Sequence, residues 1–128
     1  MLSKKLAEKT EKTKGMGKET TSGGEKPKDA EAYNNQGDIC YNKGDYNQAI
    51  SDYTRAIEIN PKYALAYYNR GLAYYNKGNY DRAIADYTKA IELDPKCALA
   101  YNNRGLGYKK AGKKIEAQRD FEKAESMK

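Results

Sequence analysis

The sequence predicts an all-α protein, a solenoid of stacked helical hairpins, on the basis of three observations. A 34-residue segment recurs: residues 30–63 and 64–97 agree at 20 of 34 positions, and residues 98–128 continue the pattern. Within each copy, apolar and small residues recur every three or four positions, which is the period of an α-helix. Each copy also has a glycine near its middle, and the first two copies end in a proline-containing turn.

Each copy is predicted to form two helices joined by a tight turn. Glycine tolerates the backbone conformation that follows a helix, so Gly44, Gly78 and Gly112 mark the ends of the first helices. Proline cannot continue a helix, so Pro61 and Pro95 mark where the second helix ends in the first and second copies. The expected helices are 30–43, 46–59, 64–77, 80–93, 98–111 and 114–126.

The first 28 residues differ in composition from the rest of the chain. They hold eight lysines, four glutamates and few apolar side chains, too few to offset the entropy lost on ordering. We expect residues 1–28 to be a flexible lysine-rich tail and residues 29–128 to be one domain of three repeats. The tail carries a charge of +4 and the domain only +2, so nucleic acid and anionic lipid are disfavoured as partners.

No set of residues in the sequence suggests catalysis or metal binding. The chain has no histidine, which excludes a Ser-His-Asp or Cys-His arrangement, and its two cysteines are far apart. No apolar run is long enough for a membrane span or a secretory signal. We expect a non-catalytic cytoplasmic protein that needs no cofactor.

The spacing of the repeated residues resembles that of the tetratricopeptide repeat. That family's pattern is aromatic-x2-Leu-Gly-x2-Tyr, then Ala-x3-aromatic, then Pro. The resemblance implies a right-handed α-solenoid that binds a protein or peptide partner. The matching residues are Tyr33/Gly37/Cys40, Tyr67/Gly71/Tyr74 and Tyr101/Gly105/Tyr108, followed by Ala49/Tyr53, Ala83/Tyr87 and Ala117/Phe121, with Pro61 and Pro95.

The chain departs from this pattern where leucine is usual, because Gln36, Arg70 and Arg104 stand there. An aspartate recurs on the second helix of each repeat, at Asp52, Asp86 and Asp120. Opposite charges at such positions attract. We therefore expect structural ion pairs between repeats, Arg70 with Asp52 and Arg104 with Asp86.

Asparagine recurs on the side of the first helices that lies opposite the packing residues, at Asn35, Asn69 and Asn103. An amide has the donor and the acceptor needed to hold a peptide unit irrespective of its side chain. Asparagine is also roughly half a kcal/mol worse than alanine in a helix. We predict that these residues form a ladder that binds an extended peptide in a concave groove. The residues expected to flank the ladder are Asn34, Asn102, Tyr41, Tyr68, Tyr75, Asn76 and Lys110.

Three alternatives stay open beside the ladder. The exposed face of a helix is polar in any case, so duplication could simply have copied the asparagines. The chain could also stack on a copy of itself, or belong to a larger scaffold, because no further helix covers Ile115, Phe121 and Met127. A basic module for nucleic acid or anionic lipid is less favoured.

The family's other known binding mode is the carboxylate clamp of co-chaperones, which needs two lysines, an arginine and two asparagines. Only Asn69 fits that set here, and all three cations are missing. We therefore do not expect a clamp. The residues at the five clamp positions are Asn34, Asp38, Asn69, Leu99 and Asn103.

Overall fold

The computed structural model describes residues 29–128, so the predicted tail lies outside the described residues. Within this range every regular element is a helix, and each agrees with its predicted span to within one residue at either end. The helices are α2 (Ala30–Asn42), α3 (Tyr46–Ile59), α4 (Ala64–Asn76), α5 (Tyr80–Leu93), α6 (Ala98–Lys110) and α7 (Lys114–Ser126).

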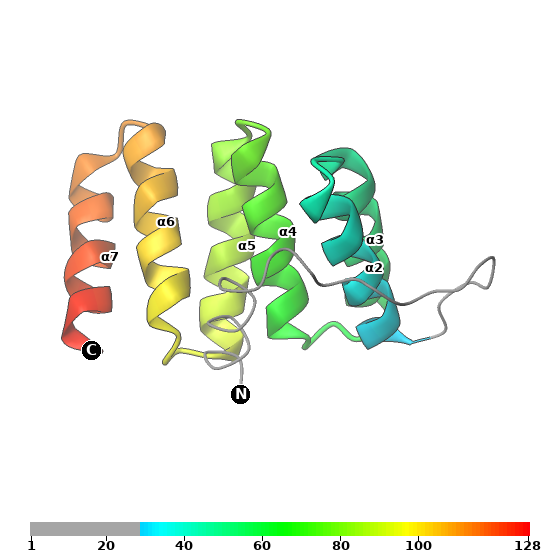
Figure 1. The fold of residues 1–128 in the computed structure, drawn as a ribbon. Coiled ribbons are helices and arrows are strands. Elements are labelled where there is room, and N and C mark those ends of the chain that lie inside the picture. The colour runs from blue at the N-terminus through cyan, green and yellow to red at the C-terminus, as the bar shows by residue number, and fades with distance from the viewer. Residues whose placement is uncertain (1–28) are drawn as a thin grey trace.

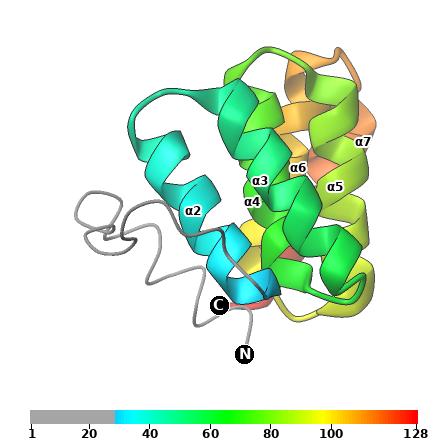
Figure 2. The ribbon, with the colours of Figure 1, turned by 90° about the vertical axis from the view of Figure 1, so that its right-hand side faces the viewer.

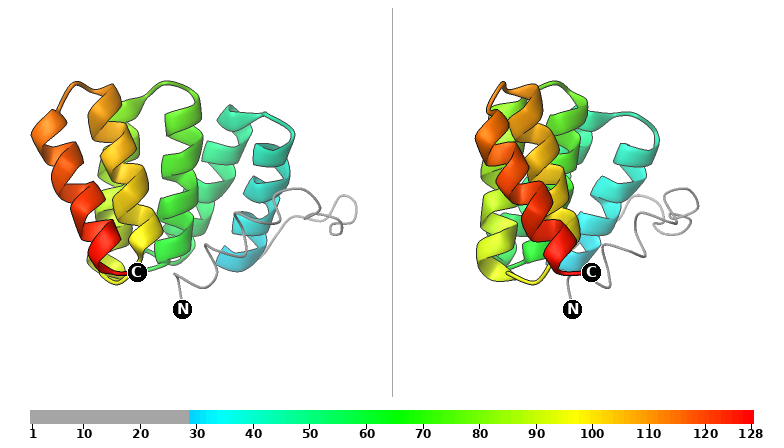
Figure 3. Two further views of the ribbon diagram at one scale, coloured as in Figure 1. Left: turned by 60° about the vertical axis from the view of Figure 1, so that its left-hand side comes forward. Right: turned by 90° about the vertical axis from the view of Figure 1, so that its left-hand side faces the viewer.

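The helices form a row of three hairpins in chain order, α2/α3, α4/α5 and α6/α7 (Figure 1). Figure 2 views the row from the end made by α2 and α3, and the right-hand view of Figure 3 shows the opposite end, where α7 lies in front. Each hairpin packs on its neighbour through the second helix of one and the first helix of the next. This is the stacked-hairpin architecture that the repeat predicts. Among the described helices, none has the length and hydropathy needed to cross a membrane.

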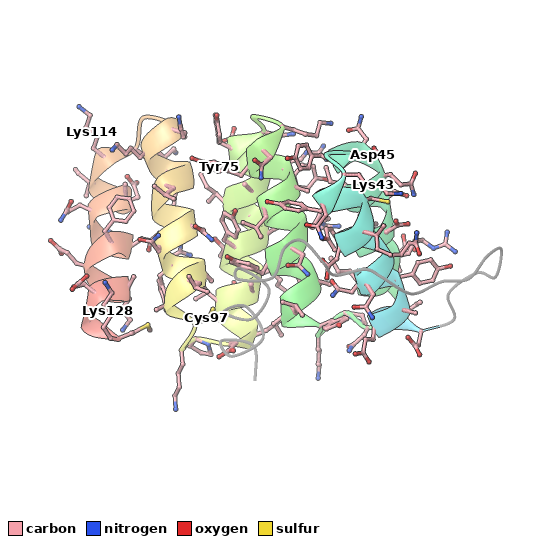
Figure 4. The ribbon with its side chains drawn as sticks, viewed as in Figure 1. Lys43, Asp45, Tyr75, Cys97, Lys114 and Lys128 are labelled. Atoms are coloured by element: carbon pink, nitrogen blue, oxygen red, sulfur yellow. The ribbon has the colours of Figure 1, made fainter. Side chains whose placement is uncertain are left out.

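The turn inside each hairpin depends on one glycine. Gly44, Gly78 and Gly112 have φ angles of 81°, 84° and 83°, in the left-handed region that favours glycine. After the first of these turns, the Asp45 carboxylate accepts a hydrogen bond from the Gln48 backbone N–H at 3.2 Å and caps α3. Figure 4 shows Lys43 and Asp45 at this turn, between α2 and α3. The glycines therefore end the first helices, as predicted.

The two helices of a hairpin approach closely because the first has a glycine opposite an aromatic ring of the second. A Cβ atom at Gly71 would lie 2.8 Å from Cε1 of Tyr87, and the same clash would arise at Gly37 with Tyr53. Both tyrosine side chains are buried. The ring occupies the space that a larger residue would need, so any other side chain there would overpack the hairpin.

A second apolar stripe on α3 and α5 joins consecutive hairpins. Ile84 of α5 packs on Gly107 of α6, and Ile91 belongs to the buried cluster that holds Ala100. Ile50 and Ile57 of α3 occupy the same positions one repeat earlier and pack beside α4. These isoleucines contribute apolar contacts between repeats.

The third repeat has a different stripe at these positions. Gln118, Glu122 and Glu125 of α7 stand where α5 has Ile84, Thr88 and Ile91, and all three are exposed. Gln118 donates a hydrogen bond to Glu122 at 3.1 Å. The outward side of α7 is therefore a solvated polar surface.

The alternative that the chain associates with itself through the third repeat therefore finds no support. The Phe121 ring already packs inside its own hairpin, where a Cβ of Gly105 would lie. Met127 is half-buried. Only Ile115 is strongly exposed, with 70% of its surface accessible.

Candidate interaction face

Hydrogen bonds from amide side chains connect the first helices of successive repeats. Asn69 of α4 donates to Oδ1 of Asn34 at 2.9 Å, and Asn103 of α6 donates to the hydroxyl oxygen of Tyr68. Asn76 donates to the hydroxyl oxygen of Tyr41 at 3.0 Å. In each case the donor lies 35 residues beyond the acceptor. These amides therefore have a structural role at the seams between repeats.

The predicted ladder is not exposed along its whole length. Asn69 is 0% exposed, and Asn34 and Tyr68 are each 2% exposed, so the prediction that they lie on an open face is wrong. Leu72 lies on the open side of α4, and Asn69 is about 60° around the helix from it. This rotation turns Asn69 toward the preceding repeat, which covers it. Asn35 is exposed, because no helix of the described range packs on that side of α2.

The other predicted site residues vary in exposure. Asn103 is half-buried through its bond to Tyr68, whereas Asn102, Asn76 and Lys110 are exposed. Tyr41 and Tyr75 are half-buried and each meets a second tyrosine edge-on. The ring centroids lie 5.3 Å apart for Tyr41–Tyr46 and 5.2 Å apart for Tyr75–Tyr80. Figure 4 places Tyr75 near the C-terminal end of α4. The peptide-binding role of all these residues stays a prediction.

One buried acceptor of the ladder is unpaired. The amide oxygen of Asn69 accepts no hydrogen bond, although the residue is fully buried. Such a group usually costs about 1–3 kcal/mol. Asn69 is therefore the member of the ladder that would gain most from a donor.

The recurring arginines and aspartates do pair, but within a repeat and not between repeats as predicted. Arg70 donates two hydrogen bonds to Asp86 at 2.8 Å each, and Arg104 does the same with Asp120. The arginine also reaches back, because Nη1 of Arg70 donates to Thr54 of the preceding repeat at 3.1 Å. The helix-surface pattern gave the direction of these side chains but could not choose between two aspartates one repeat apart.

The first repeat lacks this pair, because Gln36 replaces the arginine. Asp52 is 7% exposed and accepts hydrogen bonds from the Gln48 side chain at 3.2 Å and the Cys40 thiol at 3.6 Å. Burial raises the pKa of Asp52, and the hydrogen bonds from Gln48 and Cys40 offset this only in part. Burial and the adjacent Asp52 carboxylate raise the pKa of Cys40 to about 11, so this thiol is a poor nucleophile.

The open side of the three first helices, which we call the first-helix face, carries leucines that the asparagine ladder does not include. Leu65, Leu72 and Asn76 of α4 lie within about 40° of one another and opposite the packing tyrosines. Leu65, Leu72 and Leu99 are half-buried against the core, and Leu106 is 36% exposed. The residues of the first-helix face are Glu31, Asp38, Asn42, Leu65, Leu72, Asn76, Leu99, Leu106 and Lys110.

These leucines could have been found in the sequence. Leu65 and Leu72 are seven residues apart, as are Leu99 and Leu106, and each pair lies opposite its own packing stripe. The first repeat interrupts this pattern, because it has Glu31 and Asp38 at the same positions.

The first-helix face is also electrically asymmetric. Its α2 end carries Glu31, which is exposed, and Asp38, which accepts a hydrogen bond from the Tyr53 hydroxyl at 2.7 Å. Its α6 end carries Lys110, and Lys109 lies beside it outside the face; both are exposed in the last turn of that helix. Charge on this face therefore changes from negative at α2 to positive at the C-terminal end of α6. Within residues 29–128, no cluster of cysteine, aspartate and glutamate side chains could hold a metal ion.

The sequence matches known repeat families over most of its length. The pattern described as TPR repeat matches residues 37–78, and the tetratricopeptide repeat matches residues 64–97 and 98–128. With the row of three hairpins, these matches show that the chain belongs to the tetratricopeptide repeat family. Members of this family are generally interaction modules. No curated protein matches the chain.

Solved structures with the same fold include the crystal structure of MamA, with 38% identity and a TM-score of 0.76 over 77% of this chain. The chain covers 58% of that MamA chain. The second TPR of Spaghetti (RPAP3), bound to the HSP90 peptide SRMEEVD, has 34% identity and a TM-score of 0.77, with 79% of this chain and 94% of that one covered. The second TPR domain of human RPAP3, in complex with the HSP70 peptide SGPTIEEVD, has 34% identity and a TM-score of 0.75, with 77% and 82% covered.

Proposed function

We propose that this protein is a non-catalytic interaction module that binds an extended segment of a partner protein across the first-helix face. The observation that carries the proposal is the set of partly exposed leucines beside amide side chains on one face of the stack. Apolar anchors next to donors and acceptors are the usual make-up of a peptide site. Two similar structures hold peptides, which supports the same use here.

The asparagines supply the polar part of this proposal. Asn35 and Asn102 are exposed, so their amides can reach the backbone of a bound segment. Asn76 and Asn103 already donate to tyrosine hydroxyls of the preceding repeat, so their amide oxygens are the groups they would offer to that backbone. A ladder of this kind would bind many sequences with similar strength, because it contacts the backbone.

We further propose that the module does not act as a carboxylate clamp. The peptides in the similar structures end in two glutamates, a valine and an aspartate. At the clamp positions this chain has no cation, and Asp38 places a negative charge there. We expect a labelled SRMEEVD peptide to show no saturable binding to the full chain in a fluorescence anisotropy titration.

The proposal is tested by selecting peptides from a random displayed library on the immobilised full chain and titrating the selected peptides in solution. We expect Leu106→Asp to weaken binding at least about tenfold, because it puts a charge in the apolar part of the site. The matched control is Ala85→Asp, an exposed position on α5. Equal binding to both variants, or no selected peptide, would contradict the proposal. Circular dichroism of both variants excludes unfolding as the cause.

A further inference from the structure

The four leucines of the first-helix face form an apolar area of defined shape. Leu65 and Leu72 are separated by about 10 Å along α4, and neighbouring helices lie about 8–10 Å apart. Leu99 and Leu106 repeat the pair on α6. The four side chains therefore mark the corners of a square with sides of about 10 Å, across which three extended residues reach.

The area is bordered by opposite charges. Across α4, the positions equivalent to the leucines are Glu31 and Asp38 on α2. Beyond the leucines of α6, Lys109 and Lys110 occupy the last turn of that helix. A segment that lies across the three helices therefore meets a positive end, an apolar centre and a negative end in this order.

Resting on the function proposed above, we infer that the bound segment has two aliphatic side chains about three residues apart and a lysine or arginine about three residues further, beside Glu31. Each aliphatic side chain would contact the leucine pair of one helix, α6 or α4. The basic side chain would lie against the carboxylates of α2, and an acidic side chain or the terminal carboxylate would lie near Lys109 and Lys110. A wholly acidic segment would be repelled at the α2 end.

Charge complementarity selects this partner over the acidic peptides of the similar structures. Opposite charges across an interface speed association and exclude wrong partners, whereas like charges facing each other cost several kcal/mol. Leu65 and Leu72 occupy the centre, so polar segments would leave them without a contact. The site is thus specified by its apolar centre and by its charge gradient.

The experiment repeats the peptide selection on the wild-type full chain and on Glu31→Lys. We expect wild-type selection to enrich paired aliphatic residues with a lysine or arginine at the stated spacing. We expect Glu31→Lys to replace that basic residue with aspartate or glutamate. The matched control is Glu116→Lys, which makes the same charge change outside the first-helix face. Glu116 lies in the first turn of α7, as Glu31 lies in the first turn of α2. The control should select the wild-type pattern.

The charge contact is then measured in solution. Replacing the basic residue of a selected peptide by glutamate should weaken binding to the wild-type chain about tenfold, and Glu31→Lys should restore it. A structural role for Glu31 would not produce this exchange. Selected peptides without a basic preference, or an unchanged pattern on Glu31→Lys, would overturn the inference and leave the proposed function intact.

Two further outcomes concern the occupant. If no peptide is selected on any variant, the proposed function fails and the inference falls with it. If a synthetic peptide with the sequence of residues 1–28 displaces the selected peptides at a similar concentration, the occupant is the lysine-rich segment of this chain. That result would overturn the inference of a separate partner.

Discussion

Helices α5 and α7 have the same place in their hairpins but differ in what lies beside them. Both keep the stripe that packs inside the hairpin, as Ala83, Tyr87 and Ala90 in α5 and as Ala117, Phe121 and Ala124 in α7. The stripe that faces outward is Ile84, Thr88 and Ile91 in α5, which α6 covers, and Gln118, Glu122 and Glu125 in α7, which no described helix covers. The repeat thus preserves the residues that pack inside a hairpin. The residues on the outward side are apolar where the next hairpin covers them and polar where no described helix does.

The largest expected effect comes from giving α5 the outward residues of α7. Ile84→Gln with Ile91→Glu places polar groups in a buried seam, and we expect a loss of more than about 4 kcal/mol in the free energy of unfolding, measured with urea. The reverse change, Gln118→Ile with Glu125→Ile, should alter stability by no more than about 0.5 kcal/mol. Similar losses for the two variants would show that the difference between α5 and α7 has no energetic meaning.

The next effect contrasts the buried ion pairs with the first repeat. Arg70→Met leaves Asp86, which is 5% exposed, without its cation, and we expect a loss of about 3 kcal/mol. Gln36→Ala removes the equivalent side chain of α2, which has no ion pair, and should cost no more than about 0.5 kcal/mol. Urea unfolding of both variants measures the difference. Equal losses would mean that the arginine acts only through packing of its stem.

A smaller effect distinguishes the covered and uncovered asparagines. Asn69→Ala removes the donor to Asn34 and should lower stability by about 1 kcal/mol, partly offset because the unpaired oxygen is also removed. Asn35→Ala, at the same position in the exposed first helix, should be neutral or stabilise by up to about half a kcal/mol. Thermal unfolding of the two proteins is the measurement. A lower melting temperature for Asn35→Ala would indicate that something covers α2 in solution.

The smallest effect concerns pH. Because burial raises the pKa of Asp52 above 3.8, the folded protein binds more protons than the unfolded chain just above that pH. Stability from this group therefore falls as the pH rises through the interval between the ordinary and the raised pKa. We expect Asp52→Asn to remove this fall and to gain less than about 1 kcal/mol at neutral pH over the wild type. Parallel urea midpoints for the two proteins across a pH series would refute the assignment.

The sequence was sufficient for the helices and for the contacts inside each hairpin. Gly71 and Tyr87 belong to one 34-residue unit, so the period and the helical spacing together place them face to face. The turn glycines were equally clear, because few other residues adopt their backbone conformation.

The contacts between hairpins were harder to predict. The period shows that Asn35 and Asn69 are equivalent but not that α2 covers one of them and leaves the other exposed. In the same way, it could not decide whether Arg70 pairs with Asp52 or Asp86, since the two aspartates occupy equivalent positions one repeat apart. The leucines of the first-helix face were visible in the sequence. Their importance as accessible contacts became clear only from the structure, in which Asn69 is buried.

The row of hairpins also determines how the molecule opens. Each hairpin is held only by its immediate neighbours, so the free energy of local opening should be lowest at α2 and α7 and highest in α4 and α5. A ligand that spans the first helices would bind all three hairpins at once and so oppose fraying at both ends. Occupancy would then slow amide hydrogen exchange in α7, a helix outside the first-helix face. Ligand affinity and the free energy of local opening at the ends of the row would therefore rise and fall together in this protein.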